Sequence, residues 1–142
     1  MRRDLHHDLK WSLAEPPVAA VTNDDPFVSA ILDTAEYGAN EFLWIAGSIA
    51  DADVTFTLLL EHGDNSALSD AAAAPDADLL GTEANGAPLL TSDNKCGKIG
   101  YRGSKRYIRV TVTPANNTGN IFFAAGWLQA FPRVGALTTQ IV

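Results

Sequence analysis

Acidic side chains gather in the middle of the chain, where carboxylate oxygens could bind a calcium ion. This stretch carries Asp51, Asp53, Asp64, Asp70, Asp76 and Asp78. A calcium site needs several oxygen ligands that converge on one point, usually over a loop of defined spacing. The segments DADV and DNSALSD lack the Asp-x-Asp-x-Asp-Gly order of a helix–loop–helix calcium site. We therefore expect loop carboxylates and turn caps here, and no metal ion.

The histidines and the single cysteine lack the partners that a catalytic or zinc site requires. His6 and His7 are adjacent, and only His62 is distant. Neighbouring side chains of an extended segment point to opposite faces, which suits neither a zinc site nor a catalytic base. Cys96 has no recognisable histidine partner, no serine lies in a Gly-x-Ser-x-Gly elbow, and GKIGYRG lacks the lysine pattern of a phosphate-binding loop. We expect no catalytic residues, no cofactor and no enzymatic activity.

A basic segment, SKRYIRVTVTPANNTGN at residues 104–120, has side chains that could contact another molecule. Basic residues beside an aromatic ring can bind single-stranded nucleic acid, and they also suit an acidic protein partner. A further interpretation is a strand face that forms cross-strand ion pairs with the acidic part of the chain. We expect no nucleic acid, and the protein-contact and ion-pair interpretations both stay open. The candidate contact residues of this segment are Lys105, Arg106, Tyr107 and Arg109.

Charge is separated along the chain, which has 142 residues and a formal net charge of −7. No Lys or Arg occurs in residues 11–94, and no Asp or Glu occurs in residues 95–142. Such asymmetry either neutralises itself within the fold or leaves two patches of opposite sign. Two patches would favour an oriented contact with another molecule, or head-to-tail contact between copies.

Length and composition indicate one globular domain without a membrane segment. Hydrophobic residues make up 46% of the chain and charged residues 19%, as in ordinary globular proteins. No apolar run approaches the roughly 18 residues needed to cross a bilayer. The start, MRRDLHHDLKW, lacks the apolar stretch of a signal peptide. We expect no membrane contact.

The chain divides into an arm, a body and a tail. Residues 1–26 are predicted to be an extended N-terminal arm, because the paired prolines Pro16 and Pro17 favour extended backbone and no helical period is sustained. Leu9, Trp11 and Leu13 occupy alternate positions along it. A free tail would leave the large apolar ring of Trp11 in water, so we expect the arm to dock through these residues. Residues 27–133 form the body, and residues 134–142 form a C-terminal tail.

The body carries several short strand patterns separated by turn signals. The patterns are FVSAIL at residues 27–32, EFLWIAG at 41–47, VTFTLLLEHG at 54–63 and KRYIRVTVT at 105–113. The last of these places Ile108, Val110 and Val112 on one face. We expect ANNTGN to turn the chain so that the apolar segment 121–131 returns as the hairpin partner of this strand. No long helix and no βαβ rhythm are present, which predicts an all-β fold, an antiparallel β-sandwich or barrel.

Several of these segments together resemble a known family. DADVTFTLLLEHGDNSALSDAAA, DLLGT and KIGYRGSKRYIRVTVTPANNTGN, with the apolar strand that follows, are similar to a small structural protein of many tailed bacteriophages, often encoded beside the major capsid protein. The resemblance runs from about residue 27 to about residue 132. It implies a capsid cement or decoration protein with a jelly-roll-like β-sandwich body that clusters as small oligomers on the capsid surface.

The resemblance implies a function without chemistry. The protein would bind the outside of the capsid and stabilise it, with the major capsid protein and copies of itself, as a dimer or trimer, as its partners. It would be made in the host cytoplasm and reside on the virion surface. The residues expected to contact the capsid or a neighbouring copy are Leu9, Trp11, Leu13, Lys105, Arg106, Tyr107 and Arg109.

Two other classes of function remain as alternatives. One is a glycan-binding β-sandwich module of a phage fibre or head spike, with Trp44, Trp127 or Tyr107 as stacking platforms. Exposed aromatic rings beside a groove would favour it, and burial of both tryptophans would disfavour it. The other is a virion enzyme or head-completion factor, which would need a pocket lined with convergent carboxylates.

Overall fold

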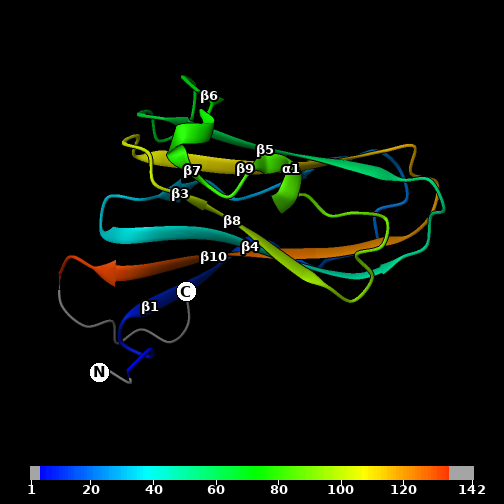
Figure 1. Ribbon diagram of the computed structural model, residues 1–142, viewed down its shortest axis with the longest axis horizontal. Coiled ribbons are helices and arrows are strands. Elements are labelled where there is room, and N and C mark those ends of the chain that lie inside the picture. Colours follow the sequence, from blue (N-terminus) through cyan, green and yellow to red (C-terminus); the bar gives the residue numbers. More distant parts are fainter. Residues whose placement is uncertain (1–3, 135–142) are drawn as a thin grey trace.

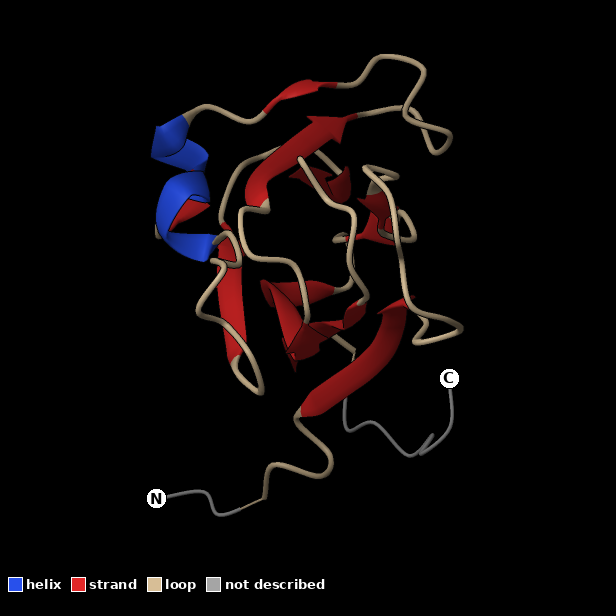
Figure 2. Cartoon of the chain, turned by 90° about the vertical axis from the view of Figure 1, so that its right-hand side faces the viewer, coloured by secondary structure: helices blue, strands red, loops and turns tan. Residues whose placement is uncertain are grey.

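The computed structural model describes residues 4–134, and strands make up most of their secondary structure (Figure 1). The strands are β1 (Leu9–Glu15), β2 (Phe27–Val28), β3 (Leu32–Asp33), β4 (Tyr37–Ile49), β5 (Thr55–Gly63), β6 (Ala72–Ala73), β7 (Leu79–Leu80), β8 (Cys96–Tyr101), β9 (Tyr107–Ala115) and β10 (Ile121–Pro132). Two short helical segments, η1 (Asp76–Asp78) and α1 (Glu83–Gly86), lie together at one side of the molecule (Figure 2). Apart from Val134, the predicted C-terminal tail (residues 134–142) lies outside the described residues.

The strands form two antiparallel sheets that pack as a sandwich. Sheet A has the order β1-β10-β4-β8-β7, and sheet B has the order β2-β9-β5-β6 with β3 also paired to β9. The predicted all-β class and antiparallel sandwich are confirmed, while the jelly-roll-like connectivity stays a prediction from the resemblance. Among the described residues, no helix is long and apolar enough to cross a membrane.

The core lies between the two sheets and follows from strand alternation. In β9, Ile108, Val110 and Val112 are fully buried, while Tyr107 and Arg109 point outward and are partly exposed, as the sequence predicts. Sheet A contributes its inward aromatic rings. These include Phe42, Trp44, Phe123 and Trp127.

The predicted hairpin between residues 105–113 and 121–131 is wrong. β9 pairs with β5, β2 and β3 in sheet B, whereas β10 pairs with β1 and β4 in sheet A. The intervening segment 116–120 therefore carries the chain from one sheet to the other. Its Asn and Gly residues supply the turn chemistry that a hairpin also needs, including a positive φ of 62° at Asn116. Partner choice depends on long-range contacts that local turn signals do not reveal.

The expected separation of an arm at residues 1–26 also differs from the structure. β1 is the edge strand of sheet A, in register with β10 from Leu9 opposite Ala130 to Leu13 opposite Gly126. Ala14 is buried, and its carbonyl accepts a hydrogen bond from the backbone N–H of Ala30. Residues 9–15 pack on the body of their own chain, because their backbone completes a sheet edge.

Candidate functional site

The arginines of the basic segment are paired with carboxylates of neighbouring strands. Arg106 donates two hydrogen bonds to Asp33, from Nη2 at 2.8 Å and Nε at 3.0 Å, which holds the pKa of Asp33 below its ordinary value. Arg109 donates two hydrogen bonds to Glu61 Oε2, at 2.7 and 3.1 Å, directly across the β5–β9 ladder. Both guanidinium groups are therefore occupied within the fold.

The other two candidate residues of this segment are held in a similar way. Lys105 Nζ donates to Asp64 Oδ2, and this contact raises the pKa of Lys105. The guanidinium carbon of Arg106 lies 5.2 Å from the centre of the Tyr107 ring. The structure thus forms the cross-strand ion pairs that the sequence left open as one interpretation.

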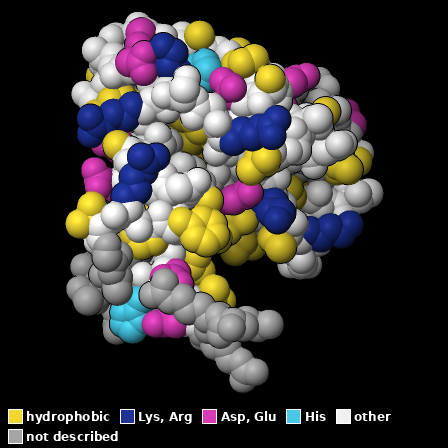
Figure 3. Space-filling model, turned by 60° about the vertical axis from the view of Figure 1, so that its left-hand side comes forward, with side chains coloured by type: hydrophobic (Ala, Val, Ile, Leu, Met, Phe, Trp, Pro, Cys, Tyr) yellow, Lys and Arg dark blue, Asp and Glu magenta, His cyan; other side chains and the backbone are white. Residues whose placement is uncertain are grey.

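The charge separation of the sequence does not persist as separate patches on the side of the molecule seen in Figure 3. There, Lys and Arg side chains lie apart from one another, with carboxylates between them. This mixing follows from the ion pairs, because β9 from the basic part of the chain pairs with β5 and β3 from the acidic part. No concentrated positive surface is seen among the described residues on this side of the molecule.

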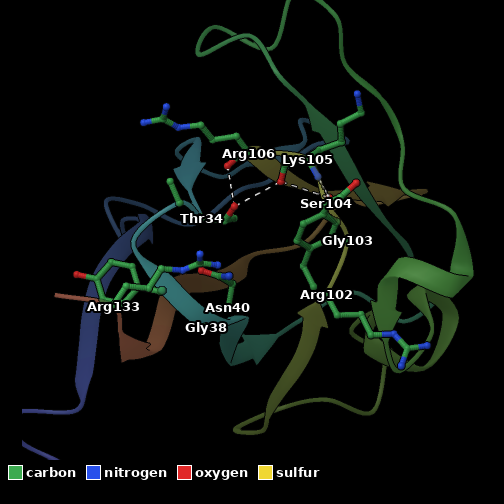
Figure 4. A pocket seen from close by; sticks show the side chains of 12 residues that line it. Thr34, Gly38, Asn40, Arg102, Gly103, Ser104, Lys105, Arg106 and Arg133 are labelled. Carbon is green, nitrogen blue, oxygen red and sulfur yellow. Dashed lines mark hydrogen bonds between the residues drawn. The ribbon is translucent and has the colours of Figure 1, made fainter. Parts of the chain in front are cut away.

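A polar hollow of about 490 Å³ lies between the segments 34–40 and 101–106 (Figure 4). Its rim is tied by Thr34, whose hydroxyl hydrogen-bonds to the carbonyl oxygens of Arg106 at 2.9 Å and Lys105 at 3.4 Å. The side chains of Arg102, Lys105 and Arg106 extend away from the hollow in this view. Arg102 instead donates to the carbonyl oxygen of Ala77. The hollow therefore does not gather these cations around a ligand.

The tryptophans proposed as glycan platforms are core residues. Trp44 and Trp127 are 4% and 1% exposed. Their indole N–H groups donate to the carbonyl oxygens of Gly86 at 2.6 Å and Ala30 at 2.9 Å. Buried rings with satisfied donors cannot stack on a sugar, so the glycan alternative loses both of them.

Metal-binding side chains do not cluster in the described part of the chain. No group of three or more His, Cys, Asp or Glu residues there could hold a metal ion. His62 Nδ1 lies 3.0 Å from the Tyr101 hydroxyl, which also hydrogen-bonds to the backbone N–H of Lys105, and 3.8 Å from Oδ2 of Asp78. The contact with Tyr101 links β5 to β8 and so joins the two sheets.

The outer face of sheet A carries several exposed apolar side chains, and we call it the apolar face. The register places its residues in rows across the strands: Trp11, Leu128, Glu41, Gly100 and Leu80; then Leu13, Gly126, Leu43 and Lys98; then Ala124, Ile45 and Cys96. Five large apolar side chains of the outer surface of this sheet are about half exposed: Trp11 49%, Leu13 56%, Ile45 56%, Leu80 48% and Phe122 49%. Exposed apolar patches of this kind mark interaction surfaces.

Two adjoining hollows lie on the apolar face. One has a volume of about 400 Å³ and lies between Trp11, Leu43 and Lys98, and the other, of about 680 Å³, extends past Gly47. Both are lined by Ile45 and Cys96. Gly126 leaves room for the Trp11 ring that lines the first hollow, because a Cβ atom at position 126 would lie 2.5 Å from Cζ2 of Trp11. The glycine lets the indole ring lie across β10.

Glu41 is a carboxylate in the middle of this apolar surface. Its side chain lies over Gly100 of β8, where an added Cβ atom would be 2.6 Å from Oε1 and 2.9 Å from Cβ of Leu80. Oε2 is buried and accepts no hydrogen bond from the described residues. Burial raises the pKa of Glu41, and the nearby charge of Lys98 lowers it by less. A buried acceptor without a donor is unusual in a folded protein.

The outer face of sheet B is chemically different, and we call it the threonine face. It carries Thr57 opposite Thr113 and Glu61 opposite Arg109, with Thr55 in a neighbouring row and Thr111 between Leu59 and Val28. Hydroxyl groups and an ion pair are well solvated in water, and only this one row adds large exposed apolar side chains. The outer face of sheet B is thus more polar than that of sheet A.

The sequence-based candidates include Trp11 and Leu13, which the structure places on the apolar face, but they do not include Glu41, Leu43 or Ile45. A signal for them was present. EFLWIAG and the segment 121–131 are apolar at both odd and even positions. This pattern is typical of strands covered on both faces, whereas the fold covers β4 and β10 on only one.

Asp51 is the second buried carboxylate of interest, and it fixes the connection between β9 and β10. It accepts hydrogen bonds from the backbone N–H groups of Asp53 at 2.9 Å and Thr118 at 2.8 Å, and from the Thr118 hydroxyl at 3.0 Å. These donors hold the pKa of Asp51 well below its ordinary value. A side-chain hydrogen bond with Asp51 and, to a lesser extent, the charge of Asp51 raise the pKa of Asp53.

We expect Asp51→Asn to destabilise the protein in a pH-dependent way. Because the folded pKa of Asp51 lies below the unfolded value of about 3.9, its ionised form stabilises the fold above about pH 4, and this contribution is lost as the pH falls further. Urea unfolding from about pH 7 to about pH 2 measures the difference between the two proteins. An Asp53→Asn background in both removes the opposing titration of that neighbour. A difference in stability that does not change with pH would contradict the assignment.

Comparisons with protein-family models, curated proteins and solved structures find no match to this chain.

Proposed function

We propose that this protein is a structural protein of a tailed-phage virion that binds the outside of the capsid and stabilises it. The observation that carries the proposal is the apolar face, a sheet surface whose side chains suit protein contact better than water. The sequence resemblance supplies the setting, with the major capsid protein and copies of the chain itself as partners. The threonine face would then point to solvent.

Such a protein stabilises a capsid by mass action. Contacts that exist only in the assembled state lower the free energy of that state relative to the dissociated one. The apolar face and the edge strand β1 provide contact area, and no cofactor or reaction is needed. We assign the shell contact to the rim formed by β1, where Leu9, Trp11 and Leu13 lie. Lys105, Arg106 and Arg109 have a smaller role than the sequence suggested, because their charges are paired within the fold.

The experiment mixes purified protein with capsids that lack it and measures the bound copies by co-sedimentation. We expect a Trp11→Ala, Leu13→Ala variant to bind about tenfold to a hundredfold more weakly, since each half-exposed side chain would bury its remaining apolar surface on the shell. Raising the salt concentration should change the attachment little, because apolar contact is not screened. Unchanged binding by the folded variant would contradict the assignment of the shell contact to the rim.

The matched control changes the opposite face. A Thr57→Ala, Thr113→Ala variant removes two hydroxyl groups that face each other across the β5–β9 ladder. We expect it to bind capsids as the natural sequence does. Circular dichroism and thermal unfolding of both variants establish that they are folded before binding is compared. A loss of binding in the control would contradict the assignment of solvent to the threonine face.

A further inference from the structure

No described part of the chain covers the apolar face. The sequences of β4 and β10 are nevertheless apolar at both odd and even positions, a pattern typical of strands covered on both sides. Ile45 and Leu13 are each more than half exposed. Leaving such surface in water is unfavourable by about 25 cal/mol per Å² of apolar area. A molecule of complementary shape and polarity would therefore bind here.

Two charges of opposite sign lie near the centre of this surface, and Lys95 lines the second hollow at its edge. Glu41 of β4 has a buried oxygen without a donor, and Lys98 of the neighbouring strand β8 forms no ion pair with any described residue. They occupy adjacent rows of the sheet, since Glu41 lies opposite Gly100 and Lys98 lies opposite Leu43. The centre of the face thus carries one acceptor and one donor side by side.

We propose that the apolar face binds the same face of a second copy of this chain about a two-fold axis, so that Glu41 of each copy meets Lys98 of the other. In a two-fold interface the same patch serves both copies, and every contact occurs twice. The two-fold axis lies in the plane between the two facing copies, midway between Glu41 and Lys98. Rotation about it places Glu41 of one copy opposite Lys98 of the other. Each buried Glu41 oxygen then gains a donor, which no described residue of its own chain supplies.

A second copy fits this surface better than a different protein would. The partner must be apolar, nearly flat, and carry one cation and one anion at the spacing of neighbouring strands, which describes the apolar face itself. Without the rim strand β1, the four strands β10, β4, β8 and β7 are about 4.8 Å apart and, with about seven residues of about 3.3 Å each, give a flat area on the order of 400 Å² per copy. Two such faces are smaller than a standard-sized interface, so we expect a weak dimer that dissociates at about a hundred micromolar.

This inference deepens the proposed function, because it rests on the same apolar face and names the partner that covers its centre. The rim at β1 remains the contact with the shell. A pair of copies would present two rims, one from each chain, and would attach to the shell at two points. Two linked attachments bind more tightly than one at the same concentration.

Sedimentation velocity tests the pairing over a range from micromolar to several hundred micromolar protein. We expect the natural sequence to pass from monomer to dimer, and Lys98→Glu and Glu41→Lys to weaken the dimer at least tenfold, because each places two like charges together twice. An equimolar mixture of the two variants should restore the dimer. In the mixed pair, the lysine introduced at position 41 meets the glutamate introduced at position 98, and the natural Glu41 and Lys98 meet each other. Rescue by mixing is not expected from a variant that is merely misfolded.

The chain also offers a test that needs no substitution. Cys96 is its single cysteine, is exposed, and lies on the apolar face. A bulky maleimide at this thiol should block dimer formation, while Thr111→Lys on the threonine face should leave it unchanged. A monomer at all concentrations, or a dimer indifferent to the label and to both charge reversals, would overturn the proposal.

The outcome separates the inference from the proposed function. A natural sequence that is monomeric yet binds capsids contradicts the pairing and leaves the capsid role in place. A dimer that fails to bind capsids contradicts the capsid role and supports the pairing.

Discussion

Replacing Trp127 by alanine should lower the free energy of unfolding by about 3–5 kcal/mol, the usual cost of removing a large buried aromatic ring. The ring is 1% exposed and packs edge to face on Phe42, with 5.2 Å between ring centres. Its N–H group donates to the carbonyl oxygen of Ala30, which lies between β2 and β3 of the other layer. The substitution therefore leaves a cavity and an acceptor without its donor. Denaturant unfolding followed by far-ultraviolet circular dichroism measures the loss.

Two further variants separate the causes. Trp127→Phe retains most of the ring and loses the hydrogen bond, so we expect a smaller cost, with about 0.5–1.5 kcal/mol of it from that bond. Trp11→Ala removes a half-exposed ring from the apolar face, and we expect it to cost less than about 1.5 kcal/mol in the free protein. A loss below about 1 kcal/mol for Trp127→Ala would show that this ring does not tie the two layers together.

Gly97→Ala should lower the free energy of unfolding by about 1–3 kcal/mol, because the added methyl group overpacks the core. A Cβ atom at this position of β8 would lie 2.3 Å from Cζ2 of Trp44. The indole ring has no simple escape, because it is buried and its N–H group is bonded to the carbonyl oxygen of Gly86 at 2.6 Å. We expect a lower midpoint of denaturant unfolding and a changed near-ultraviolet dichroism of the tryptophans.

The neighbouring residue and a double variant provide the controls. Cys96→Ala changes an exposed side chain on the opposite face of the same strand and should be close to neutral. Trp44→Leu makes room, so that adding Gly97→Ala to it should cost less than in the natural sequence. Additive costs in this double-mutant cycle would contradict the contact between the two residues.

The alternation within single strands could be predicted from the sequence, whereas the partners of those strands could not. Ile108, Val110 and Val112 alternate with polar residues, and each is buried as expected. The wrong hairpin arose because ANNTGN satisfies the local demands of any tight connection. β10 pairs with β4 and β1 because this arrangement buries Phe123 and Trp127 in the core. The core residues that surround them come together only in the folded chain.

The fate of the basic residues was also beyond the sequence. Alternation placed Arg109 on an outward face, but its pairing with Glu61, 48 positions earlier, depends on the register of β5 and β9. Arg106 likewise finds Asp33 only because β3 pairs with β9. Charge separation along a chain is therefore compatible with local neutrality in the fold.

The docking of the N-terminal segment was predicted, but its place was not. Alternation of Leu9, Trp11 and Leu13 indicated an extended segment laid along a surface. Two physical facts decide that this surface is the protein's own sheet. β10 leaves an edge of unpaired backbone groups, and Gly126 leaves room for the Trp11 ring. The apolar side chains of β1 consequently extend the apolar face at its rim.

A three-dimensional reconstruction of the purified virion is the decisive test of the proposed function. We predict density for this chain on the outside of the capsid, with the apolar face buried against protein and the threonine face turned to solvent. The absence of this chain from the outer layer would contradict the proposed function, and outer-layer density that places Ile45 and Leu43 in solvent would contradict the burial of the apolar face.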